Sequence, residues 1–325
     1  MNTRSTILNG PVAVATASGT ERTPVPIGVA AQPATAVNFE MPPGACDCLT
    51  HIFGDTAHFP MAPGRTYTPE PASIAELEAL HRALHVDRVV IVQTTVYGTD
   101  NACMLDAVSH LGANARGVAV IDSKTPAAAL DDMDRAGVRG IRINLETIGV
   151  TDPALARQRF QAAVEQVRGR PRWHIQIYTR PSVIEAIYDL LVACPVPVSF
   201  DHFAGAQALG GMREAGFGLL LDLLRAGRVY VKLSAPELVS KLGPEYPDVV
   251  PLAKALIAAN PERILWASHW PHPNSGGGKE RKPTEITPLR QIDDGYILNL
   301  LPLWAPDAAD RKRILVDNPA RLFGF

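Results

Sequence analysis

Residues Ile264 to Pro273 read ILWASHWPHP, an apolar run that ends in a group of imidazole, indole and proline side chains. The run has the length and hydrophobicity of a buried strand. The two histidines at its end, His269 and His272, have no packing use in such a strand. The segment is therefore interpreted as a strand that ends at the floor of a reaction site.

Seven more apolar runs of strand length precede this one, and segments of helical period separate them. The predicted strands are 45–52, 88–93, 117–121, 140–144, 173–177, 196–200, 229–233 and 264–267, and the predicted helices include 74–84, 102–111, 127–136, 154–167, 182–192, 212–225 and 249–259. Eight such units, in a span close to the roughly 250 residues typical of the fold, predict a (β/α)8 TIM barrel. An open doubly wound sheet is the alternative. It is disfavoured because no G-x-G-x-x-G follows the first strand and polar residues end every strand.

The composition is that of an ordinary globular protein. The chain has 325 residues, of which 46% are hydrophobic and 20% charged, and a net charge of −2. Nucleic acid is not expected as a partner because the chain is not basic. No apolar stretch approaches the roughly 18 residues that a membrane span requires. Residues 1–44, rich in Ala, Thr, Pro and Gly, are predicted to be a loosely packed extension, and residues 45–325 to be the catalytic barrel.

The four cysteines form no C-x-x-C pair. Cys46 and Cys48 are predicted to share one face of the first strand, because side chains alternate along a strand. Structural thiols of this kind favour a reduced, cytoplasmic protein. The apolar run 12–18 is short for a secretory signal and follows Gly10 and Pro11, so export is not expected.

Barrel enzymes build their sites at the carboxyl ends of the strands, so the polar residues there are expected to converge. They include His51, Thr95, Arg142, Tyr178, His202, Lys232 and His269. Asp201 precedes His202 and is expected to face the helix layer, because adjacent strand residues point to opposite faces. The glycine-rich stretch Gly276 to Lys279 follows the last strand and is expected to be a flexible lid segment.

Several motifs resemble one known family. They are DCLTHIFG at 47–54, FPMAP at 59–63, RTYTP at 65–69, IVQ at 91–93, GTDN at 98–101, RGIR at 139–142, DH at 201–202, WASHWPHP at 266–273 and DNPARLF at 317–323. In order and as a set, they are similar to the amidohydrolase-related barrels, in the branch of the 2-pyrone-4,6-dicarboxylate lactonases. The resemblance implies a (β/α)8 barrel that acts on a lactone or a related cyclic, carboxylated substrate.

Two positions depart from the family pattern. Leu49 stands where the family usually has the first histidine of D-x-H-x-H, and His269 stands where it usually has an aspartate. The lactone isomerase branch of the family departs at the same two places, with other residues. The resemblance therefore leaves three alternatives: a lactone hydrolase, a lactone isomerase or lyase, and a lapsed barrel that only binds its ligand.

A binuclear metal site is not expected. The chain lacks the first histidine, the aspartate and a histidine at the fifth strand, where Tyr178 stands. A single zinc ion held by His51, His202 and His269 is chemically possible, because three neutral imidazoles leave one coordination position open. The resemblance to the metal-independent branch favours a site with no cofactor.

Lactone opening without a metal needs a base for water and donors for the oxyanion. His269 is the predicted base, because an imidazole titrates near pH 6.5, and His51 and His202 are predicted to act with it. Arg142 is predicted to hold a substrate carboxylate. Further substrate contacts are assigned to Tyr67, Tyr178, Lys232, Thr95 and His272. For Lys232 the alternative is an ion pair with a carboxylate inside the barrel.

The expected partner is a small molecule. Beyond Arg142 the chain does not keep the arginines that the resemblance associates with a dicarboxylate. A substrate with fewer negative charges is therefore expected, such as a monocarboxylated lactone or a sugar-acid lactone. The sequence does not identify the substrate or the oligomeric state.

Overall fold

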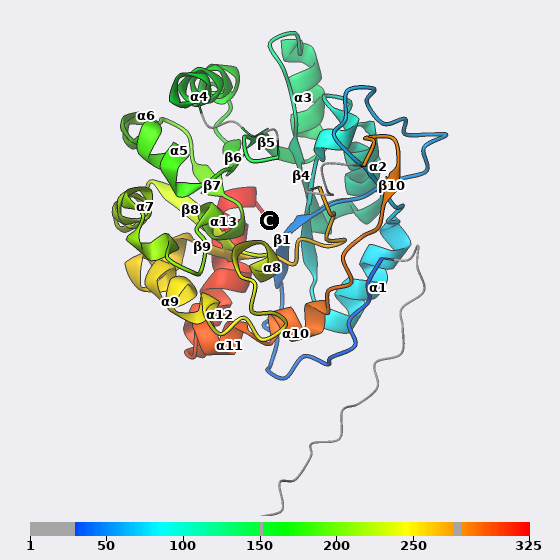
Figure 1. Cartoon of the computed structure of the whole chain (residues 1–325). Helices are drawn as coiled ribbons and strands as arrows, with labels where there is room; N and C mark the ends of the chain where they lie inside the picture. Colours follow the sequence, from blue (N-terminus) through cyan, green and yellow to red (C-terminus); the bar gives the residue numbers. More distant parts are fainter. Residues whose placement is uncertain (1–29, 148, 150–151, 276–280) are drawn as a thin grey trace, which may run out of the picture.

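The protein, described by a computed structural model over residues 30–147, 149, 152–275 and 281–325, folds as a (β/α)8 barrel (Figure 1). Its eight parallel strands are paired in chain order. They are β1 (Cys46–Thr50), β3 (Arg88–Val92), β4 (Ala115–Ala119), β5 (Val138–Asn144), β6 (His174–Tyr178), β7 (Val198–Phe200), β8 (Val229–Leu233) and β9 (Ile264–Trp266). The sequential order confirms the predicted barrel, because a doubly wound sheet reverses its strand order at a switch point.

The first and last strands of the sheet are joined just beyond their carboxyl ends. The backbone N–H of His269 donates to the carbonyl of Leu49 over 3.0 Å. The backbone N–H of His51 donates to the carbonyl of Trp270 over 2.9 Å. These two bonds bring the segment after β9 directly beside the end of β1, at the mouth of the barrel.

Most helices surround the strands on the outside of the barrel, whereas α8 and α13 lie over its centre (Figure 1). They are α1 (Ile74–Leu84), α2 (Ala102–Leu111), α3 (Ala127–Arg135), α4 (Pro153–Val167), α5 (Pro181–Ala186), α6 (Tyr188–Ala193), α7 (Ala215–Arg225), α8 (Pro236–Val239), α9 (Val249–Ala259), α10 (Asp294–Leu298), α11 (Leu301–Trp304), α12 (Ala308–Lys312) and α13 (Asn318–Phe323). None of the described helices is both long enough and apolar enough to cross a membrane.

Local signals explain where most helices begin. At α1, the Ser73 side chain accepts the Glu76 N–H, and the Glu76 carboxylate accepts the Ser73 N–H, which is a capping box. At α4, Asp152 caps the first turn and Pro153 occupies the first helical position. The predicted helix 182–192 is instead two helices, because the buried Ile187 adopts φ −114° and ψ 14° between them.

The barrel interior is apolar at its lower end and polar near its mouth. Cys46 and Cys48 both belong to the buried interior cluster, as strand alternation predicts. Phe323 of α13 joins the same cluster, and Figure 1 places the carboxyl terminus at the centre of the ring of strands. Gly140 permits the close approach of β5 and β6, because a Cβ there would lie 2.5 Å from the His174 carbonyl oxygen.

Residues 30–44, the described part of the extension expected over residues 1–44, pack against the barrel, and residues 1–29 lie outside the described residues. Ala30 and Ala31 are buried. The indole N–H of Trp270 donates to the carbonyl of Ala31 over 3.1 Å, and the Thr35 hydroxyl donates to Asp293 over 2.6 Å. This segment is therefore anchored beside the carboxyl ends of β1 and β9.

Two short strands connect the loops at the mouth of the barrel. β2 (Thr68–Pro69), in the long loop after β1, pairs in parallel with β10 (Ile286–Thr287), which follows β9. The expected lid segment, Gly276 to Lys279, lies outside the described residues.

Candidate active site

Six of the predicted site residues line one cavity of about 30 Å³ at the mouth of the barrel. They are His51, Tyr67, Thr95, Arg142, Tyr178 and His269, and Thr94, Asn144, Thr147, Leu238, Pro273 and Ser275 complete the wall. A volume of this size admits about one water molecule. The predicted convergence of strand-end side chains is thus observed around a water-sized chamber.

A second cavity of about 540 Å³ adjoins the first one. Thr95, Arg142 and Asn144 line both cavities, and the remaining walls come from the ends of β4 and β5 and from α4. Small-molecule sites usually have volumes of this order. Arg142 therefore lies between the water-sized chamber and a space large enough for a ligand.

The histidine rings at the mouth are in contact with one another. The ring centroids of His202 and His269 are 4.4 Å apart, and those of His51 and His269 are 5.6 Å apart. Tyr178 lies 4.8 Å from His202 by the same measure. His269 is thus the central ring of the group, although it comes from the last strand.

The backbone around these rings is strained. His202, Ala235, His269 and His272 all have φ between 51° and 72°, a region that residues with side chains rarely adopt. Each such residue costs about 1–3 kcal/mol, and strain of this kind clusters at functional sites. All four residues follow β7, β8 or β9, so the strain is concentrated where the imidazoles are positioned.

His51 has a defined tautomer. Its Nδ1 lies 2.8 Å from the carbonyl oxygen of Val92, which can only accept, so Nδ1 carries the proton. Burial lowers the pKa of His51 well below its ordinary value, and the positive charge of Arg142 adds to this effect. The ring is therefore neutral near pH 7, and its Nε2 is a bare acceptor.

His202 has a different partner, the hydroxyl of Ser234. The Ser234 oxygen accepts the backbone N–H of His202 over 3.3 Å and lies 2.9 Å from its Nδ1. The arrangement that satisfies the hydroxyl proton is donation to Nδ1, which leaves the ring proton on Nε2. This Nε2 is buried and has no hydrogen-bond partner within the described ranges. Burial also lowers the pKa of His202 well below its ordinary value.

His269 faces the carboxylate of Glu237, in the first turn of α8. The Nδ1 atom of His269 lies 3.7 Å from Glu237 Oε1. Burial lowers the pKa of His269, and the carboxylate opposes that effect in part. Burial alone would raise the pKa of Glu237, but the two neighbouring imidazoles outweigh it and lower the pKa. The pair is therefore a neutral imidazole beside an anionic carboxylate.

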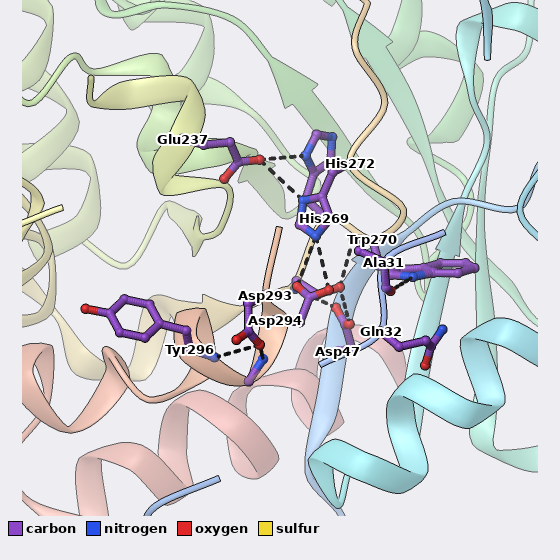
Figure 2. A network of polar contacts seen from close by, with 12 residues as sticks. Ala31, Gln32, Asp47, Glu237, His269, Trp270, His272, Asp293, Asp294 and Tyr296 are labelled. Carbon is purple, nitrogen blue, oxygen red and sulfur yellow. Dashed lines mark hydrogen bonds and ion pairs between the residues drawn. The ribbon is translucent and has the colours of Figure 1, made fainter. Parts of the chain in front are cut away.

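His272 lies behind His269 and not at the cavity, in contrast to its predicted role in substrate binding. The fully buried His272 lies between two carboxylates (Figure 2). Its Nδ1 is 3.4 Å from Glu237, and its Nε2 is 3.1 Å from Asp294. Burial alone would lower the pKa of His272, but Asp294 and Glu237 raise it to about 10. His272 is thus an imidazolium that links Glu237 to Asp294, the first residue of α10.

Arg142 is positioned by Asp201. Its Nε and Nη2 both donate to Asp201 Oδ2 over 3.2 Å, so the guanidinium retains Nη1 for the cavity side. The expectation that Asp201 faces the helix layer is wrong. Asp201 follows the last residue of β7, and its side chain turns into the barrel, where Gln176 also donates to it over 2.9 Å.

Lys232 forms the ion pair that was the alternative to substrate binding. Its ammonium lies 3.2 Å from Asp201 Oδ1, and both side chains are fully buried. Burial alone would raise the pKa of Asp201, but the charges of Lys232 and Arg142 outweigh it and lower the pKa. The buried carboxylate therefore stays ionised between the two cations.

The two predicted tyrosines keep their phenolic protons. Burial raises the pKa of Tyr67 to about 12, and burial together with the charge of Glu146 raises the pKa of Tyr178 to about 12. Both hydroxyls line the cavity as neutral groups and can donate to a bound oxygen.

One group of side chains has the spacing of a metal site. Ligand atoms of Glu237, His269 and His272 lie within 4.8 Å of one another. This group differs from the alternative zinc set expected from the sequence, in which His51 and His202 took the places of Glu237 and His272. Both nitrogens of His272 face carboxylates, so this ring could bind an ion only after it loses a proton from one of them.

Sequence reasoning missed Glu237 and Asp294, and it did not connect Ser234 with His202. Ser234 and Glu237 belong to the segment SAPE at 234–237, directly after β8. A glutamate four residues beyond a barrel strand was an available signal. Nothing in the local pattern linked Asp294, 22 residues after His272, to the site.

The family model described as "Amidohydrolase" matches residues 46–325. The chain belongs to the amidohydrolase family. This family member is 36% identical to the 4-sulfomuconolactone hydrolase of Rhizobium radiobacter, an alignment that covers 89% of the chain and 92% of the relative. It is also 36% identical to a 2-pyrone-4,6-dicarboxylate hydrolase of Comamonas testosteroni, over 88% of the chain and 92% of the relative.

The fold of this family member also matches solved structures. A crystal structure of an Agrobacterium tumefaciens protein superimposes with a TM-score of 0.73 at 25% identity, covering 89% of the chain and 99% of that structure. The amidohydrolase resemblance expected from the motifs is thereby confirmed, and so is the barrel.

Proposed function

We propose that this protein hydrolyses the lactone ring of a small carboxylated molecule. The observation that carries the proposal is the composition of the wall of the water-sized chamber. The wall combines the neutral imidazoles of His51 and His269, the phenols of Tyr67 and Tyr178, and the guanidinium of Arg142. The two relatives named above are hydrolases of a muconolactone and of a pyrone, both of them cyclic esters. A hydrolase on a cyclic ester is the function that this geometry and these relatives support best.

The proposed reaction begins with a water molecule in the small chamber. His269 takes a proton from the water, and the water oxygen attacks the lactone carbonyl carbon. The oxyanion is held by neutral donors, namely His202 Nε2–H and the phenol of Tyr178 or Tyr67. When the ring C–O bond breaks, the leaving alkoxide takes the proton back from His269, and a hydroxy acid is released.

Arg142 is the proposed site for a substrate carboxylate. It lines both cavities, and Asp201 already occupies two of its nitrogens. One carboxylate suits what remains of this guanidinium better than two carboxylates do. The substrate class is therefore a monocarboxylated or sugar-acid lactone, held in the larger cavity with its acyl carbon toward the histidines.

The proposal includes no metal. Each proton transfer is assigned to a side chain, and His272 is held as a cation by two carboxylates. We also place the reaction in the cytoplasm, since Cys46, Cys48, Cys103 and Cys194 are free thiols.

A panel of lactones and cyclic esters, read by acid release and by proton NMR, tests the proposal. The expected product is a ring-opened hydroxy acid, and His269→Asn serves as the inactive control. A rearranged lactone with no acid release would instead make the protein an isomerase. Saturable ligand binding with no conversion would make it a lapsed barrel.

A further inference from the structure

We propose that Ser234 and Glu237 fix opposite tautomers in the neighbouring rings of His202 and His269, so that one imidazole is the proton donor and the other the proton acceptor. The inference rests on the proposed function for its catalytic meaning. The tautomers themselves are a property of the resting protein. Ser234 and Glu237 are thus positioning residues that act through the two histidines.

The first half of the arrangement concerns His202. Ser234 receives the backbone N–H of His202 and directs its own proton to Nδ1, over 2.9 Å. A neutral imidazole carries one N–H, so the ring proton is on Nε2. That atom is buried and unpartnered among the described residues, beside the rings of Tyr178 and His269. His202 Nε2 can therefore donate a hydrogen bond to a ligand oxygen.

The second half concerns His269. Its Nδ1 is buried, lies 3.7 Å from Glu237 Oε1 and has no other polar partner in the described parts of the chain. An anionic carboxylate can only accept, so it favours the tautomer with the proton on Nδ1. The Nε2 of His269 is then the bare nitrogen. Contacts of catalytic pairs are often long before a ligand binds, and a small rotation shortens this one to a hydrogen bond.

Glu237 is itself held in its anionic form. His272 lies 3.4 Å from the same Oε1 atom and reaches Asp294 with its other nitrogen (Figure 2). The imidazolium of His272 stabilises the negative charge of Glu237, and Asp294 retains the proton on His272. The series Asp294, His272, Glu237 and His269 therefore ends in one defined tautomer at the cavity.

The backbone explains how one short segment serves both rings. Ala235, between Ser234 and Pro236, has φ 51° and ψ 60°, and α8 begins directly after it. This left-handed residue turns the chain so that Ser234 faces His202 while Glu237 faces His269. The two rings are 4.4 Å apart, so a donor and an acceptor stand side by side. Two rings of the same tautomer would offer either two donors or two acceptors to the reacting atoms.

The experiment uses the full-length protein labelled with 15N in histidine. Imidazole 15N shifts and their couplings to ring protons distinguish the two tautomers, and His202→Asn and His269→Asn assign the signals. We expect the Nε2–H form at His202 and the Nδ1–H form at His269. Ser234→Ala should alter the tautomer signals of His202, and Glu237→Gln those of His269, because a glutamine amide can donate as well as accept.

Kinetics supply the second readout once a turned-over lactone is known. Glu237→Gln should lower kcat by about 10²- to 10⁴-fold, the range that proton transfer contributes, with KM within about threefold. Glu237→Asp, which keeps the anionic acceptor, should recover part of the loss. Glu245→Gln is the matched control, because Glu245 is an exposed carboxylate nearby in the sequence and should leave both the 15N signals and kcat unchanged.

Three results would overturn the inference. The same tautomer in both rings of the unsubstituted protein would refute it directly. A Glu237→Gln protein with unchanged His269 signals would remove Glu237 as the cause. Stoichiometric zinc that shifts the His269 and His272 signals together would assign Glu237, His269 and His272 to an ion instead. Opposite tautomers in a protein that opens no lactone would uphold the inference and refute only the proposed function.

Discussion

The guanidinium of Arg142 and the carboxylate of Asp201 form a buried pair in which two N–H groups, from Nε and Nη2, converge on one oxygen over 3.2 Å. The other oxygen of Asp201 lies 3.2 Å from Lys232. One internal carboxylate therefore orients Arg142, the arginine proposed to bind the substrate, and neutralises Lys232. The orientation of Arg142 at the cavity therefore depends on Asp201, which does not line the cavity.

Arg142→Lys is expected to weaken substrate binding. A lysine keeps the charge but loses the planar fork, so it cannot satisfy Asp201 and a substrate carboxylate at once. KM should rise at least about tenfold, or roughly 1.4 kcal/mol, in steady-state kinetics with the hydrolysed lactone. Unchanged kinetics would show that Arg142 has only a structural role.

Asp201→Asn is expected to destabilise the fold. The substitution leaves the charges of Arg142 and Lys232 buried without a carboxylate, and breaking a buried pair costs about 3–5 kcal/mol. Urea denaturation should show this loss. Asp222→Asn is a matched control, because the exposed pair of Asp222 with Arg225 contributes little. Equal stability of the two variants would contradict the prediction.

The rate of hydrolysis is expected to rise with pH through one ionisation of His269. Burial lowers the pKa of this ring below its ordinary value near 6.5, so kcat/KM should fall only as the pH drops through a value below 6.5. The charged and titratable groups that face the ring are Glu237, His272, His51, His202 and Arg142. His269→Asn should abolish this fall of kcat/KM at low pH and lower the rate by about 10²- to 10⁴-fold.

His269→Asp distinguishes the hydrolase from the isomerase. The variant has the residue that the lactonase branch usually carries at this position. If the native protein is already a hydrolase, the variant should form no new product. The rise of its kcat/KM with pH should move to lower pH, because a carboxylate titrates lower than an imidazole. Hydrolysis that appears only in the variant would identify the native protein as an isomerase.

Removal of metal is expected to leave activity intact. After prolonged chelation, kcat should stay within about twofold of its starting value, with elemental analysis confirming the loss of zinc. Zinc near one equivalent per chain whose removal abolishes turnover would contradict metal independence. It would also bear on the group of Glu237, His269 and His272, whose spacing suits an ion.

A chain that begins at Phe39 is expected to be less stable than one that begins at Ala30. The shorter chain loses the Ala31 acceptor for Trp270 and the bonds of Thr35 to Asp293. These three hydrogen bonds alone correspond to about 1.5–4.5 kcal/mol, and five further hydrogen bonds of residues 30–38 are lost with them. Urea denaturation measures this loss. No candidate catalytic residue lies in residues 30–38, so kcat should persist wherever the shorter chain is folded. A tenfold loss of kcat in the folded shorter chain would place this segment in the site.

The sequence by itself determined the positions of strands and helices, and it placed the site at the carboxyl ends of the strands. Apolar runs and helical periods are local properties, so β8, α1, α2 and α9 have the bounds that the sequence predicts. Polar residues at the ends of those runs gave His51, Arg142, Tyr178 and His269 as cavity residues, because a barrel brings all carboxyl ends to one face.

Only the tertiary structure decided which polar groups face one another. The side to which Asp201 turns, just beyond the end of β7, is not fixed by strand alternation, and its position between Arg142 and Lys232 depends on three separate strands. The contact of Glu237 with His269 depends on the left-handed backbone at Ala235. Because this residue is not a glycine, the sequence did not predict that conformation. Residue types and strand order are encoded locally, whereas the protonation state of each imidazole depends on neighbours brought from distant parts of the chain.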